Sequence, residues 1–121
     1  MPTKRQPGTD FVRSDIRRAM LKVHILWRAA NGEANPYSLT KEFGGDKVIS
    51  SFFADKKDLR NDVYNAVRSL EKAGLLVSSR RIENGRLKQY YAITEGGEKV
   101  LDSSVKEFLR GSKGVAALFR K

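Results

Sequence analysis

Asn84-Gly85 lies between two stretches of extended character, residues 75–82 and 87–93. Asn-Gly is the strongest short-range signal for a two-residue β-hairpin turn, because both residues tolerate the left-handed backbone that such a turn needs. The segment before the hairpin, residues 59–73, repeats apolar residues at helical spacing and is followed by Gly74, a residue type that often ends a helix. A helix running directly into a hairpin is therefore the first constraint on the fold.

The turn also predicts which hairpin residues face each other. One face is expected to be apolar, pairing Leu76 with Ile93, Ser78 with Tyr91, Arg80 with Gln89 and Ile82 with Leu87. On the other face Arg81 stands opposite Lys88. Two like charges across strands cost stability unless an anion covers them, and a phosphate backbone is such an anion.

Two helices are expected before the helix at residues 59–73. The first begins at Ser14 as N-cap and ends at Asn31-Gly32, and the second begins at Pro36 and ends at Gly44-Gly45. The first helix has two apolar sides. We assign to the core the side with Ile16, Ala19, Met20, Val23, Trp27 and Ala30, which leaves Leu21 and Ile25 for a partner. No motif decides the structure of residues 46–57.

Thr94 is predicted to cap a last helix, with Glu95 and Glu98 in its first turn. Its apolar side carries Leu101, Val105, Phe108 and Leu109, and Gly111 and Gly114 are expected to interrupt it. Together with Leu21 and Ile25, these four residues form the predicted dimer interface. We divide the chain into a flexible basic arm (1–13), a folded domain (14–93) and a terminal dimerisation element (94–121).

Composition narrows the function classes. The formal net charge of +10 favours an anionic partner, and 40% hydrophobic residues favour a folded chain. Without cysteine and with one histidine, the sequence excludes disulfides, thiolate metal sites and cysteine nucleophiles. No nucleotide-binding loop or catalytic constellation is visible, so we expect no enzyme activity, cofactor or metal. No signal peptide or membrane span is visible either, and a cytoplasmic location is the default expectation.

Three helices, a two-stranded hairpin and a final helix make the element order of a winged helix-turn-helix, a mainly α fold with a small β-hairpin (α+β). In such a fold the helix at about 56–73 enters the DNA major groove, and the wing, residues 80–88, reaches the backbone or minor groove. The candidate DNA-binding residues are Lys56, Lys57, Arg60, Asn61, Tyr64, Asn65, Arg68, Arg80, Arg81, Asn84, Arg86 and Lys88. The two helix asparagines are the most informative, because asparagine is a poor interior helix residue.

The sequence resembles the PadR-like transcriptional regulators over roughly residues 15–110. The resemblance rests on Tyr64, on Leu70-Glu71-Lys72-Ala73-Gly74-Leu75, and on Tyr91-Ala92-Ile93-Thr94-Glu95-Gly96-Gly97. It implies a homodimer whose terminal helices form the interface and whose recognition helices meet a two-fold DNA site.

Two alternatives stay open at this point. The same fold could serve an architectural or replication-related role with weak sequence preference, which the +10 charge favours. It could also be a protein interaction module whose basic surface binds an acidic partner. Sequence-specific regulation of transcription is the leading hypothesis, and the sequence does not identify an effector ligand.

Overall fold

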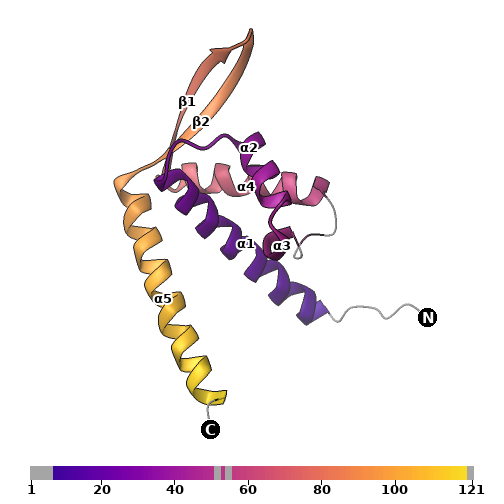
Figure 1. Ribbon diagram of the computed structural model, residues 1–121, viewed down its shortest axis with the longest axis vertical. Coiled ribbons are helices and arrows are strands. Elements are labelled where there is room, and N and C mark those ends of the chain that lie inside the picture. The colour runs from indigo at the N-terminus through magenta and orange to yellow at the C-terminus, as the bar shows by residue number, and fades with distance from the viewer. Residues whose placement is uncertain (1–6, 51–52, 54–55, 120–121) are drawn as a thin grey trace, which may run out of the picture.

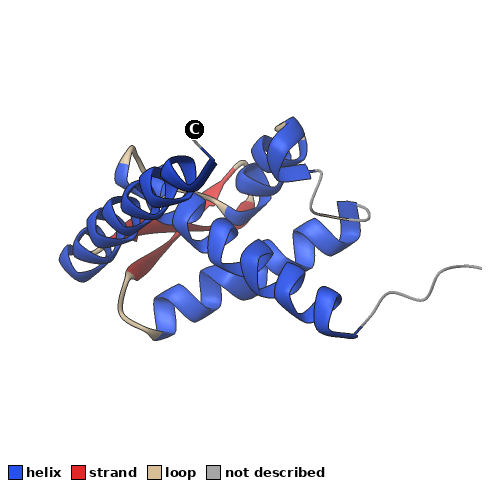
Figure 2. Cartoon of the chain, turned by 90° about the horizontal axis from the view of Figure 1, so that it is seen from below, coloured by secondary structure: helices blue, strands red, loops and turns tan. Residues whose placement is uncertain are grey.

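The structure is a computed structural model that describes residues 7–50, 53 and 56–119. Its elements, in chain order, are α1 (Pro7–Ala30), α2 (Pro36–Gly44), α3 (Lys47–Ser50), α4 (Lys56–Lys72), β1 (Leu76–Glu83), β2 (Arg86–Ile93) and α5 (Glu95–Phe119). The helices make up the body of the described chain, and the two strands form one ribbon (Figure 2). That ribbon projects from the body, and α5 leaves its base in another direction (Figure 1). The predicted fold class is confirmed.

Helix α1 begins earlier than predicted. Its first residue is Pro7, so residues 7–13 belong to the helix and not to a flexible arm, and Ser14 lies inside the helix instead of capping it. Proline is compatible with this position because the first turn of a helix leaves its amide groups unpaired in any case. The rest of the predicted arm, residues 1–6, lies outside the described residues.

The two sides of α1 are the reverse of the prediction. Leu21 and Ile25 are buried in the core, with exposed fractions of 1% and 0%, whereas Ile16 and Trp27 are 53% and 57% exposed. The side with more apolar residues was assigned to the core, but the α1 residues that join the core cluster are Leu21, Ile25, Leu26 and Ala29. Helices α4 and α5 also reach the other side, where Ala19 and Val23 line a groove shared by the three helices. The assignment of Leu21 and Ile25 to a dimer interface is therefore wrong.

One core cluster joins all the elements that precede α5. Its members are Leu21, Ile25, Leu26, Ala29, Ala34, Leu39, Phe43, Ile49, Leu59, Val63, Ala66, Val67, Leu70, Leu76 and Tyr91. The contribution of Ile49 comes from α3, in the segment whose structure no sequence motif decided. Asp46 caps this short helix, accepting a hydrogen bond of 2.9 Å from the Ile49 amide.

Helix α4 and the hairpin follow the predictions closely. Gly74, at a φ of +78°, ends the helix. Its amide donates to the Glu71 carbonyl and that of Leu75 to the Leu70 carbonyl, each at 2.9 Å, which is the Schellman pattern. The strands pair in the predicted register, from Leu76 with Ile93 to Ile82 with Leu87. Asn84 and Gly85 both have positive φ, as the predicted turn requires.

Helix α5 begins at the predicted cap. The Thr94 hydroxyl accepts from the Gly97 amide at 3.0 Å and donates to the Gly74 carbonyl at 2.7 Å, which fixes the helix start against the end of α4. The helix continues to Phe119, so Gly111 and Gly114 do not interrupt it as predicted. A glycine in a helix costs only about 1 kcal/mol, and the surrounding residues outweigh it.

Two other features are absent from the part of the chain that the structure describes. Among those residues no helix is long and apolar enough to span a bilayer. They also contain no cluster of three or more histidine and acidic side chains that could hold a metal ion.

Candidate nucleic-acid interface

The exposed face of α4 gathers polar side chains opposite its buried face. Five of the predicted residues line one shallow groove there: Arg60, Asn61, Tyr64, Asn65 and Arg68. Arg68 donates a hydrogen bond of 3.1 Å to the side-chain oxygen of Asn65. The helical period alone brings these residues together, because the apolar positions of α4 are taken up by the core.

Two lysines complete the predicted set at the start of α4. Lys57 is exposed in the first turn. Lys56 is the first residue of the helix, but its side chain lies outside the described residues. Farther along α4, Asp62 forms an ion pair of 3.1 Å with Arg17 of α1. The Arg17 guanidinium also lies 5.3 Å from the centre of the Phe53 ring. The ion pair ties α4 to α1 on the side away from the groove.

A second, larger groove joins α4 to the wing. It is lined by Tyr64, Val67 and Arg68 of α4, by residues 35–38 at the start of α2, and by residues 83–84 and 86–91 of the hairpin. Tyr64 and Arg68 belong to both grooves, so the exposed face of α4 and the wing share one concave surface. The contribution of α2 to this groove was not predicted. Tyr37 is exposed there, with the Lys41 ammonium 4.6 Å from its ring centre.

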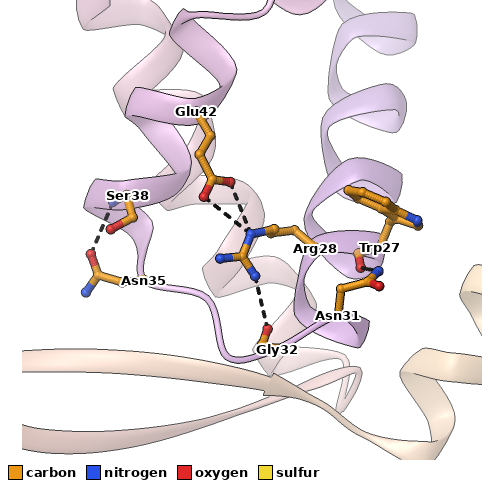
Figure 3. Close-up of polar contacts among 7 residues, drawn as sticks. All are labelled: Trp27, Arg28, Asn31, Gly32, Asn35, Ser38 and Glu42. Carbon is orange, nitrogen blue, oxygen red and sulfur yellow. Dashed lines mark hydrogen bonds and ion pairs between the residues drawn. The ribbon is translucent and has the colours of Figure 1, made fainter.

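The start of α2 is held in place by polar contacts with its neighbours (Figure 3). The Asn35 side chain accepts from the amides of Tyr37 and Ser38 at 3.0 and 3.2 Å, which caps the helix. Arg28 of α1 donates to Glu42 of α2 at 3.2 Å and to the Gly32 carbonyl at 3.4 Å. Of these contacts, the one between Arg28 and Glu42 joins α1 directly to α2.

The five predicted wing residues have different surroundings. Arg80 and Arg86 are exposed and form no ion pair within the described residues. Asn84 forms the hairpin turn together with Gly85 and has a positive φ. Arg81 is bonded to Glu33, and Lys88 lies 3.7 Å from Glu83. The like charges of Arg81 and Lys88 are thus balanced by carboxylates of the same chain. No phosphate is therefore needed to offset the repulsion between these two cations.

These contacts also shift the pKa values of wing residues. The hydrogen bond with Glu33 raises the pKa of Arg81, and the hydrogen bond with Glu83 raises the pKa of Tyr90. Burial raises the pKa of Tyr91, whose ring packs in the core. Arg81 is therefore charged, and both tyrosines carry their protons, at neutral pH.

The face of the hairpin predicted to be apolar is buried only at its base. Leu76 and Tyr91 join the core, but Ile82 and Leu87, which pair near the turn, are 78% and 64% exposed. The outer half of the wing extends beyond the helices (Figure 1), so nothing in the body covers these two side chains. The outer wing has no hydrophobic core of its own.

The arrangement of α2, α4 and the hairpin defines a winged helix-turn-helix protein, the class in which a helix and an adjacent hairpin bind DNA together. The model of the PadR-like family of transcriptional regulators matches residues 37–103, which include the whole α4 groove and all of the wing groove except Asn35 and Pro36. The chain belongs to this family. It is therefore a transcriptional regulator rather than an enzyme.

Relatives of known structure and sequence agree with this membership. A transcriptional regulator of Mycobacterium tuberculosis is 32% identical over 89 residues, which cover 72% of this chain and 74% of that protein. The structure is similar to that of a PadR family regulator from Eggerthella lenta, with a TM-score of 0.70 and 25% identity over 94% of this chain and 96% of the other.

A third comparison concerns a protein bound to DNA. The fold is shared with Bacillus subtilis PadR, whose crystal structure holds operator DNA, with a TM-score of 0.59 and 23% identity. The match covers 71% of this chain and 46% of that protein, and at this identity it shows the fold alone.

Proposed function

We propose that this protein is a sequence-specific regulator that binds double-stranded DNA through α4 and the wing. The observation that carries the proposal is the concave surface on which the exposed face of α4 continues into the wing groove through Tyr64 and Arg68. A helix in the major groove and a hairpin on the adjacent backbone or minor groove require such a shared surface. The proposal is supported by Bacillus subtilis PadR, which shares the fold and whose crystal structure contains operator DNA.

The side chains on α4 suit base recognition. Asparagine can form two hydrogen bonds with adenine, and arginine can do so with guanine. Asn61, Asn65 and Arg68 are exposed on one side of the helix, and Arg60 and Lys57 near its start are placed to meet phosphates. In this proposal the asparagines and Arg68 read bases, while the other cations position the helix.

Substitution on α4 tests base recognition. Asn61→Ala and Arg68→Ala are each expected to reduce the preference for the cognate site by about 1–3 kcal/mol, and to weaken binding to random DNA much less. Fluorescence anisotropy with the DNA upstream of the gene and with a randomised duplex pool, across a salt series, measures both quantities. Lys99→Ala, an exposed cation of α5, is the matched control and should change neither.

The same measurement separates the second candidate function. A hundredfold preference of the unaltered protein for the upstream DNA, about 2.7 kcal/mol, supports a regulator that reads bases. Equal, salt-sensitive binding to all duplexes would instead support an architectural role, which the net charge of +10 favours. Absence of duplex binding at low salt would contradict both DNA-binding functions. It would favour the remaining alternative, a protein interaction module that binds an acidic protein.

We also propose that the protein acts as a homodimer, as the family resemblance implies. Without Leu21 and Ile25, the predicted interface retains Val105 of α5 as an exposed apolar residue. We add Ile16 and Trp27 of α1, which were predicted for the core and are exposed. Leu101 packs partly against the core, and the side chains of Phe108 and Leu109 lie outside the described residues. A two-fold dimer would place two α4 helices against two half-sites.

Light scattering at micromolar concentration checks the dimer. The unaltered protein is expected to show twice the mass of the chain, and Val105→Asp is expected to shift it toward the monomer by placing a charge in the interface. Ser103→Asp, at an exposed position of the same helix, controls for the added charge. A monomeric unaltered protein would rule the proposal out.

A further inference from the structure

The side of the wing that carries Arg81 and Lys88 is occupied by a network of polar contacts within the chain. Arg81 bonds to both carboxylate oxygens of Glu33, and its guanidinium lies 4.6 Å from the centre of the Tyr90 ring. The Tyr90 hydroxyl donates to Glu83 at 2.7 Å, and Glu83 also lies 3.7 Å from Lys88. Every charge in this network therefore has an internal partner.

Three consecutive residues of the α1–α2 loop hold the wing. Glu33 bonds to Arg81 through its side chain. The backbone of Ala34 pairs with Tyr91 on the free edge of β2, with hydrogen bonds of 2.7 and 2.8 Å in the two directions. The Asn35 side chain donates to the Gln89 carbonyl at 2.9 Å while it caps α2. The loop thus connects the wing to the start of α2 residue by residue.

Only Glu33 among these three reaches the outer part of the hairpin. Ala34 and Asn35 hold β2 at Tyr91 and Gln89, toward the base. Beyond them the pair Ile82 and Leu87 is exposed, and a two-stranded hairpin without a packed face is only marginally stable in water. Hydrophobic packing does not set the direction of the outer wing, which leaves the strand pairing and the polar contacts to do so.

We propose that Glu33, through Arg81, is a positioning residue that sets the angle of the wing against α4, and that Arg81 does not bind phosphate. This inference rests on the proposed DNA-binding function. It reassigns Arg81 from the DNA-contact residues predicted from sequence. Arg80 and Arg86 remain as the wing cations without an ion pair among the described residues, and Lys88 remains in the wing groove near Glu83. An exposed ion pair contributes little to overall stability, so its effect is expected in binding rather than in unfolding.

The alternative role of the same pair predicts the opposite sign. If Arg81 bound phosphate and Glu33 competed with DNA for it, removing the Glu33 charge would release a cation and tighten binding. If the pair positions the wing, removing either partner lets the wing move and weakens binding by a similar factor. Glu33→Gln therefore distinguishes the two roles by the direction of its effect.

The experiment measures the affinity of the full chain for one labelled duplex across a salt series. Glu33→Gln and Arg81→Gln are each expected to weaken binding about three- to tenfold. The double variant is expected to weaken binding no more than either single variant. The charge swap, Glu33→Arg with Arg81→Glu, is expected to restore most of the lost affinity. The steepness with which the logarithm of the binding constant falls against the logarithm of the salt concentration should be the same for Arg81→Gln as for the unaltered protein. Arg80→Gln, the matched control, should reduce this steepness, the salt slope, by about 0.9. Glu98→Gln on α5 controls for the change in net charge.

Two results would overturn the positioning role. One is tighter binding by Glu33→Gln together with a salt slope lowered by about one in Arg81→Gln, which would make Arg81 a phosphate contact. The other is an unchanged affinity in both variants.

A readout without DNA separates this inference from the proposed function. Hydrogen exchange at the Ala34 and Tyr91 amides, which bond loop to strand, is expected to accelerate several-fold in Glu33→Gln and in Arg81→Gln alike. Failure of the unaltered protein to bind any duplex would refute the proposed function. Unchanged exchange in these variants would refute the positioning role on its own.

Discussion

Ile25→Ala is expected to lower the free energy of unfolding by about 2–5 kcal/mol, because the side chain is fully buried and its removal leaves a cavity between packed helices. Ile25 belongs to the core cluster that residues of α2, α3, α4 and both strands also form. Urea denaturation followed by circular dichroism at two protein concentrations measures the loss.

Ile16→Ala on the same helix is the matched control. It removes the same atoms from a position that is 53% exposed, and the expected change is within about 0.5 kcal/mol at low protein concentration. If Ile25→Ala cost no more than Ile16→Ala, or if its cost depended on protein concentration while that of Ile16→Ala did not, Ile25 would belong to an interface between chains and not to the core.

Gly97→Ala is expected to destabilise the protein by about 3 kcal/mol, at the upper end of the range for overpacking. A Cβ at this position would lie 2.7 Å from Cγ1 of Ile93 and closer still to the carbonyl oxygen of Leu75, and a backbone oxygen cannot move aside as a flexible side chain can. The carbonyl also accepts from the Thr94 amide at 3.1 Å, so moving it would disturb the start of α5. Thermal unfolding measures the effect.

The adjacent Gly96 gives a control of opposite sign. A Cβ there would meet its neighbours at 3.7 Å or more, an ordinary contact distance, and its φ is not positive. Gly96→Ala is therefore expected to stabilise the protein by about 0.4–1 kcal/mol by reducing the freedom of the unfolded chain. A Gly97→Ala variant that is as stable as Gly96→Ala would contradict the close approach of α5 to Leu75.

The close approach at Gly97 matters for the proposed dimer. Thr94 and Gly97 hold the start of α5 against the end of α4 and the base of the hairpin, so the direction in which α5 leaves the body is set where the recognition helix ends. A dimer formed through α5 would transmit that direction to the spacing between the two α4 helices. The shape of the interface and the spacing of the DNA half-sites are then linked by one short contact.

Much of the candidate site followed from local sequence. The groove on α4 consists of five residues that helical spacing places on one side, once the apolar residues are assigned to the core. The wing could be located as well, because Asn84-Gly85 specifies the turn and thereby the register. The roles of Arg81 and Lys88 could not be read in the same way. Glu33 lies 48 residues before Arg81, and no local pattern pairs them.

The sequence by itself determined what depends on neighbouring residues: the hairpin turn and its register, the ends of α2 and α4 at their glycines, and the Thr94 cap. Each rests on backbone conformation and hydrogen bonds over a few residues. The buried side of α1 could not be predicted from the sequence, because both sides are apolar. Only the contacts of α1 with other elements in the tertiary structure distinguish the two sides. Tertiary structure also decided which wing cations are free, because a charge is balanced by whatever lies near it in space.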